Sequence, residues 1–146
     1  MEKLKTKHEQ LSTALDRLKE AINHLEKSKS YAEQIQNLEA EDMYRSFRDS
    51  LIQRFEFCSD LFWKYIKRYM DKKMKQPVEF NAPKPVIRTA CKAKLITEQD
   101  AEKLLEMIED RNASSHIYKE EIADQIGLNT KKYYKLMREY TNKLAP

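Results

Sequence analysis

The chain has 146 residues, of which 36% are charged and 40% hydrophobic, with a single glycine and four prolines. A length of this order is typical of one domain, and abundant charge with few turn-forming residues predicts long amphipathic helices. No apolar run approaches the roughly 18 residues that span a bilayer, and the charged start MEKLKTKHEQ is unlike a secretion signal. We therefore expect one all-α domain over residues 1–146, located in the cytoplasm and without membrane association.

The net charge of +4 is unevenly distributed. Residues 64–75 contain six Lys or Arg against one Asp, and residues 131–143 contain five against one Glu, with tyrosines between the charges. Such stretches are either solvated helix faces or surfaces that bind nucleic acid or nucleotides. Within the first stretch, Lys64, Lys67 and Arg68 are candidates for binding RNA or a nucleotide.

The two cysteines, Cys58 and Cys91, belong to no paired-cysteine motif. With only three scattered histidines, the chain offers no zinc-ligand spacing, so we expect neither a metal site nor a cofactor. Free cysteines are among the most frequently buried residues, and we expect both thiols to be buried.

Apolar periodicity predicts two long helices in the first half of the chain. Leucine and isoleucine recur every three, four or seven positions over residues 4–25, with His8 at the edge of that stripe. Residues 37–42 (NLEAED) are the expected turn. An aromatic stripe over residues 47–69 then predicts a second helix whose rings form the core. Trp63 lies beside this stripe, where it could serve an interface.

Two further helices are expected between residues 76 and 113. Three prolines within residues 76–85 forbid a continuing helix, and the third helix should begin near residues 83–85, since proline is tolerated in a first turn. Thr97 has the character of an N-cap for a fourth helix. Extending the apolar stripe of that helix leads to Arg111. An arginine in this position points into a groove or toward a partner chain, where it needs an anion or several acceptors.

The last part of the chain allows two interpretations. Apolar residues stay in phase from residue 114–118 to the C-terminus, which predicts one helix, either straight or kinked at Gly127. Residues 121–140 (EIADQIGLNTKKYYKLMREY) also fit a helix-turn-helix pattern with a basic second helix, which would make the chain a DNA-binding module.

A candidate reactive site lies in RNASSHIY, residues 111–118. Histidine can take up and release protons near neutral pH, and arginine stabilises phosphate charge, so His116 and Arg111 suit metal-independent cleavage of RNA by its own 2′-hydroxyl. The Tyr118 hydroxyl could donate a hydrogen bond or accept a modification. Asn112 and Ser115 suit a turn and would line the site. Ordinary capping and ion-pair roles at a helix end are the alternative.

The same residues carry a family resemblance. RNASSHIY resembles the Arg-x4-His-x-Tyr motif of HEPN domains, and residues 104–126 are similar to nucleotidyltransferase substrate-binding proteins. Residues 53–69 resemble the second-helix signature of that family. Residues 82–96 resemble the start of its third helix, although Ala82 stands where a capping Ser or Asn is usual. The signature positions of the second helix are Arg54, Phe55, Glu56, Trp63 and Lys64.

The resemblance implies an up-and-down bundle of four or five helices that forms a homodimer, with two motif ends meeting in one cleft. It also implies a partner, a minimal nucleotidyltransferase encoded next to this chain. In related toxin–antitoxin pairs the HEPN chain is a metal-independent ribonuclease, silenced when AMP is added to the motif tyrosine, here Tyr118. Phosphodiester charge added beside Arg111 would occupy the place of RNA phosphate. The alternative implied by the family is a non-catalytic subunit that binds substrate for the nucleotidyltransferase.

Overall fold

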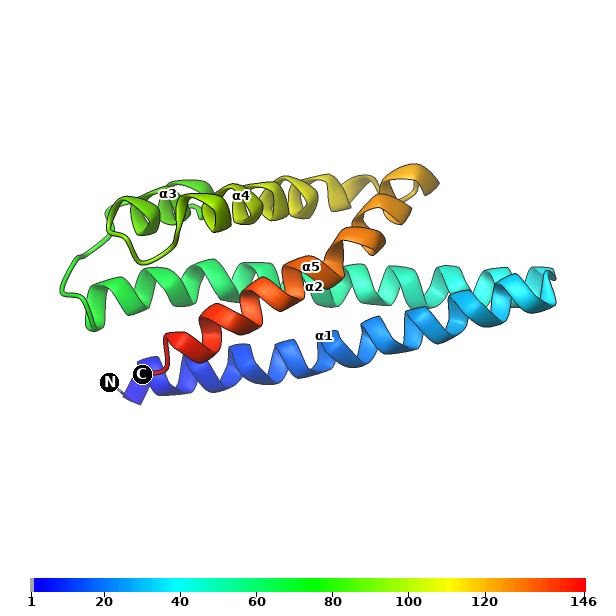
Figure 1. The fold of residues 1–146 in the computed structure, drawn as a ribbon, viewed down its shortest axis with the longest axis horizontal. Coiled ribbons are helices and arrows are strands. Elements are labelled where there is room, and N and C mark those ends of the chain that lie inside the picture. The colour runs from blue at the N-terminus through cyan, green and yellow to red at the C-terminus, as the bar shows by residue number, and fades with distance from the viewer. Residues whose placement is uncertain (1) are drawn as a thin grey trace.

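The computed structural model describes residues 2–146, which form an all-α bundle (Figure 1). The predicted fold class is therefore confirmed. The elements, in chain order, are α1 (Glu2–Ile35), α2 (Leu38–Lys72), α3 (Pro83–Lys92), α4 (Glu98–Ala113), the short 3₁₀ helix η1 (Ser114–His116) and α5 (Glu120–Lys143). None of the described helices is both long and apolar enough to cross a membrane.

Helix α2 is the centre of the bundle and contacts each of the other four α-helices. It forms a long antiparallel hairpin with α1, and α5 crosses this hairpin diagonally (Figure 1). Helices α3 and α4 cover another side of α2, and the two chain termini lie near the same end of the bundle. The C-terminal end of α4, η1 and the start of α5 therefore lie together, away from the termini.

The predicted stripes of α1 and α2 form the core. Burial of these apolar side chains is the main force that holds amphipathic helices together, because isolated helices are marginal in water. The prediction that Trp63 serves an interface is wrong for the described chain, since only 7% of this residue is exposed and it packs into the core. His8 lies at the core edge as predicted, with Nε2 2.8 Å from the carbonyl oxygen of Thr141. The buried residues of the aromatic stripe include Leu51, Phe55, Cys58, Phe62 and Ile66.

The predicted turn at residues 37–42 is wrong by a few positions. Helix α1 ends at Ile35, and Gln36 has a positive φ of 51°, which reverses the chain. Asn37 is the N-cap of α2, and its side-chain oxygen accepts a hydrogen bond from the Ala40 backbone N–H at 2.8 Å. The asparagine and the following acidic residues are cap and first-turn signals, so residues 38–42 belong to the helix.

The predictions for α3 and α4 are largely confirmed. Helix α3 begins at Pro83, although Ala82 makes no side-chain cap hydrogen bond, as expected from the missing Ser or Asn. Thr97 caps α4 by accepting from the Asp100 backbone N–H at 3.1 Å. Of the two cysteines, Cys58 is buried, and this burial raises its thiol pKa to about 12. Cys91 is only partly buried, so the expectation of a buried thiol is wrong there.

Helix α5 is continuous from Glu120 to Lys143, so the helix-turn-helix prediction is wrong. Gly127 lies within the helix without a positive φ, and buried residues lie on both sides of it. The predicted helix start at residues 114–118 is also corrected. These residues form η1 and a turn, and α5 begins only after Lys119, which makes no side-chain cap hydrogen bond.

Candidate functional site

The three motif residues lie at one end of the bundle, where α4 passes through η1 into α5. Arg111 is in the last turn of α4, His116 ends η1, and Tyr118 lies in the short link before α5. Ser114 is the C-cap of α4, and its hydroxyl donates to the Arg111 carbonyl oxygen at 2.6 Å. This local bond fixes the direction in which the chain leaves α4.

The position of Arg111 at the end of an apolar stripe predicts an anionic partner. In the structure that partner belongs to the same chain. Its guanidinium forms a bidentate pair with Asp60, with Nε 3.2 Å from Oδ1 and Nη2 3.1 Å from Oδ2. Its Nη1 lies 3.4 Å from a carboxylate oxygen of Glu56. Hydrogen bonding to Asp60 raises the pKa of Arg111, which therefore stays charged. Asp60 was not among the predicted site residues. The signal available for it was its spacing of four residues from Glu56, which places both carboxylates on one face of a predicted helix.

His116 and Tyr118 are both exposed, and their side chains contact each other. The Tyr118 hydroxyl is 3.4 Å from His116 Nδ1, and the two rings meet edge to face with centroids 5.8 Å apart. Tyr118 is 73% exposed, and Lys119 Nζ lies 5.9 Å from the centroid of its ring. The phenol thus has an imidazole nitrogen beside it and an open approach for a second molecule.

Two sets of contacts, each involving a buried side chain, position this exposed end. Arg48 is 2% exposed and binds Glu120 at 2.7 Å and Asp124 at 3.0 Å, which anchors the first turn of α5 to α2. The hydrogen bond from Arg48 lowers the pKa of Glu120. The buried carboxylate of Asp110 accepts from the Tyr133 hydroxyl at 2.6 Å and ties α4 to α5. His116 and Tyr118 therefore project from a segment that is held on both sides.

The remaining predicted residues of the motif play local roles. The Ser115 hydroxyl donates to the Asn112 carbonyl oxygen at 3.3 Å, and both residues are exposed at the turn. Within the described chain, no direct hydrogen bond or ion pair joins Arg111 to His116. Arg111 is instead bound to α2, while His116 faces Tyr118. In the described part of the chain, no group of three His, Cys, Asp or Glu side chains is placed to hold a metal ion.

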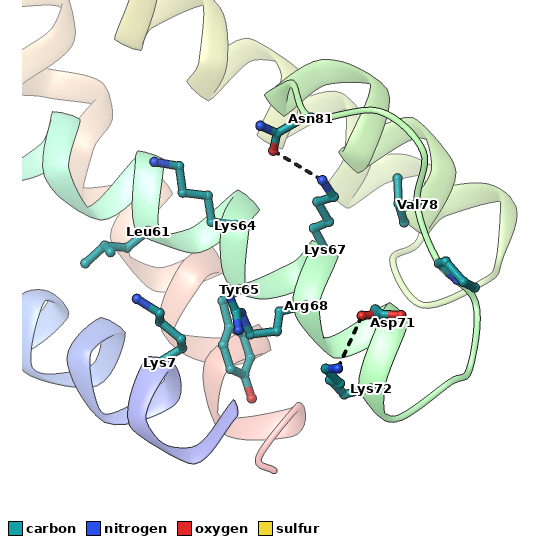
Figure 2. A pocket seen from close by; sticks show the side chains of 11 residues that line it. Lys7, Leu61, Lys64, Tyr65, Lys67, Arg68, Asp71, Lys72, Val78 and Asn81 are labelled. Carbon is teal, nitrogen blue, oxygen red and sulfur yellow. Dashed lines mark hydrogen bonds and ion pairs between the residues drawn. The ribbon is translucent and has the colours of Figure 1, made fainter. Parts of the chain in front are cut away.

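The predicted basic residues Lys64, Lys67 and Arg68 line a separate pocket of about 460 Å³ (Figure 2). Lys7 of α1 and the loop after α2 complete its walls. None of the residues 111–118, all of which the structure describes, lines this pocket. The structure therefore places the predicted basic residues apart from the motif.

The family model described as "Nucleotidyltransferase substrate binding protein like" matches residues 9–146, which include α2, the motif and the basic residues. The chain belongs to this family. The predicted family is thereby confirmed, and membership associates the chain with a nucleotidyltransferase.

A solved structure extends this result to the fold. The chain is similar to the crystal structure of a protein from Thermus thermophilus, with 29% identity and a TM-score of 0.74. The similarity covers 93% of this chain and 99% of that one. No curated protein matches the chain.

Proposed function

We propose that this member of the nucleotidyltransferase substrate-binding family is a metal-independent ribonuclease toxin, and that its partner nucleotidyltransferase silences it by adding AMP to Tyr118. The observation that carries the proposal is the exposed Tyr118 hydroxyl beside His116 Nδ1, at 3.4 Å. An acceptor of modification must be reachable by a second enzyme, and its proton needs an acceptor. The exposure of Tyr118 supports the first requirement, and in this proposal Nδ1 of His116 accepts the proton.

The modification step uses groups that lie at this end of the bundle. The phenolic oxygen of Tyr118 attacks the α-phosphorus of ATP, the bond to the β-phosphate breaks, and pyrophosphate leaves. The phenol proton passes to Nδ1 of His116, which is within reach in the free chain. The product carries a phosphodiester charge next to the residues that would otherwise act on RNA.

The ribonuclease step needs proton transfer and charge stabilisation. The 2′-oxygen of RNA attacks the adjacent phosphorus, the bond to the 5′-oxygen breaks, and a 2′,3′-cyclic phosphate and a 5′-hydroxyl result. His116 transfers the proton, and Arg111 stabilises the charge that develops on the phosphate. Asn112 and Ser115 shape the turn that carries both residues. In this proposal a homodimer brings two such ends into one cleft.

The test is RNA cleavage by the purified, unmodified chain in the presence of a chelator. Wild type should cleave, and His116→Ala should lose at least about a hundredfold in rate, the usual contribution of general acid–base catalysis. The matched control is His24→Ala, which removes an exposed histidine of α1 that packs beside Phe47. Equal cleavage by His116→Ala and His24→Ala would refute the ribonuclease proposal.

A second candidate function is a non-catalytic subunit that binds substrate for the nucleotidyltransferase. The observation that favours it is the pairing of the Arg111 guanidinium with Asp60 and Glu56, because two carboxylates compete with any RNA phosphate. This function predicts that purified, unmodified wild type leaves RNA intact and forms a stable complex with the nucleotidyltransferase. It also predicts that His116→Ala retains the affinity of that complex, measured by calorimetry.

A further inference from the structure

We infer that the pocket between the start of α1, the C-terminal part of α2 and the loop that follows binds a nucleoside triphosphate through its phosphate groups. Five cationic side chains and one carboxylate line this pocket (Figure 2). The cations come from two helices, and the loop closes the remaining side. They are Lys7, Lys64, Lys67, Arg68 and Lys72, and the carboxylate is that of Asp71.

The charges of this pocket are poorly neutralised by the chain itself. Among the side chains that the structure describes, Lys7, Lys64 and Arg68 have no carboxylate within ion-pairing distance. Lys67 donates to the Asn81 side-chain oxygen at 3.2 Å, which links α2 to the loop, and Lys72 lies 3.7 Å from Asp71. Several cations around one concavity, three of them without a carboxylate partner, create a local positive potential that attracts anions.

The second basic stretch, residues 131–143, provides the contrast. Four of its five cations pair with carboxylates, three of them on other helices: Lys131 with Glu26, Lys132 with Glu106, Arg138 with Asp16 and Lys143 with Glu139. These ion pairs explain why residues 131–143 are rich in Lys and Arg: the stretch is a helix face whose charges are mostly paired. The same explanation does not apply to residues 64–72. Lys72 can also complement the C-terminal end of the α2 dipole, but Lys64 and Arg68 lie at least one turn earlier.

The volume and lining of the pocket favour a small polyanion over a nucleic-acid strand. Its volume of about 460 Å³ lies within the usual range for small-molecule sites, roughly 300–1,000 Å³. Apolar surface from Leu61, Pro77 and Val78 lies beside the cations and offers contact for a base or sugar. The Tyr65 ring forms one side of the pocket and is held in place, because its hydroxyl donates to the Leu144 carbonyl oxygen at 2.5 Å. A nucleoside triphosphate combines an apolar ring with several adjacent negative charges.

The experiment is calorimetric titration of the chain alone with ATP, adenosine and tripolyphosphate. ATP should bind with one site per chain, tripolyphosphate should compete with it, and adenosine should bind at least about tenfold more weakly, since charge-assisted hydrogen bonds supply the affinity. The Lys64→Ala/Arg68→Ala variant should lose at least about tenfold in ATP affinity. Lys7→Glu, on a different helix, tests the same pocket if the double variant is poorly folded.

The matched control is Lys132→Ala/Lys135→Ala, which removes two positive charges from the ion-paired stretch and therefore gives the same net charge as the double pocket variant. It should retain ATP affinity within about twofold, because general electrostatic attraction between exposed charges is weak at physiological salt. Equal loss in both double variants would overturn the inference, as would the absence of ATP binding. Binding of a single-stranded oligoribonucleotide without binding of ATP would also overturn it and assign the pocket to RNA.

The pocket inference is independent of the proposed ribonuclease. His116→Ala and Tyr118→Phe should bind ATP as wild type does, because neither residue lines the pocket. A chain that binds ATP but leaves RNA intact would therefore contradict the ribonuclease proposal alone. A chain that cleaves RNA but does not bind ATP would contradict the pocket inference alone.

Discussion

Replacing the only glycine, Gly127, by alanine is expected to stabilise this chain. Gly127 lies inside the continuous α5, and a glycine in a helix interior costs about 0.5–1 kcal/mol relative to alanine. A methyl group built at this position would lie 3.6 Å from Arg48 Cγ and 3.9 Å from Leu25 Cδ2, which are ordinary contacts. The helix therefore accepts the side chain without displacement, and the full gain of about 0.5–1 kcal/mol should be retained.

Urea unfolding followed by circular dichroism measures the change in free energy. In thermal unfolding, a gain near 1 kcal/mol should raise the melting temperature by about 3 °C. The matched control is Ala123→Gly, one turn earlier in α5 and fully buried. It should lose about 1–2 kcal/mol, because both helix propensity and a buried methyl group are removed. A loss of more than about 1 kcal/mol in Gly127→Ala would refute the continuous helix and favour a turn at Gly127.

Three further outcomes are expected. A maleimide should label the native chain at Cys91 before Cys58, because Cys58 is buried and its thiol pKa is raised to about 12; faster labelling of Cys58 would contradict this packing. Asp60→Asn should change the free energy of unfolding by about 1 kcal/mol or less, since its ion pair with Arg111 is partly exposed. If the proposed ribonuclease function holds, the same variant should lower KM for RNA, because only Glu56 then competes for the guanidinium. Burial raises the pKa of Tyr65 from 10.0 to about 12, so its contribution to stability is present below pH 10 and lost as the pH rises toward 12. Unfolding measured across this range should show a shallower decline for Tyr65→Phe than for wild type.

The order of the helices could be predicted because each one has its apolar residues at helical spacing. The predicted helix boundaries were less accurate, because capping interactions determine where a helix begins and apolar periodicity does not. The turn before α2 depends on Asn37, whose side chain caps the helix, and the start of α5 depends on the tertiary ion pairs of Arg48. For Gly127, local sequence allowed a turn, whereas burial of the residues on both sides of it stabilises the helix.

The candidate site was predictable only as far as its residues are neighbours in sequence. His116 and Tyr118 are two positions apart, and the short turn leaves them in contact. The partner of Arg111 is Asp60, 51 residues away on α2, and no local pattern specifies that pairing.

The roles of the two basic stretches, residues 64–75 and 131–143, could not be predicted from local sequence either. Their compositions are similar, but only the second faces carboxylates such as Glu26 and Glu106 on other helices. Which charges remain free is a property of helix packing, because it depends on the residues that neighbouring helices present. The sequence alone could therefore not distinguish the ion-paired helix face of residues 131–143 from residues 64–72, whose cations line a pocket.

The intact mass of the chain after incubation with its nucleotidyltransferase and ATP tests the central claim most directly. Wild type should gain the mass of one adenylate, and Tyr118→Phe should gain none. Tyr31→Phe, which removes another exposed tyrosine, is the matched control and should be modified as wild type is. An adenylate on Tyr118→Phe, or no adenylate on wild type while the nucleotidyltransferase is active, would contradict the assignment of the motif end as the site on which that enzyme acts.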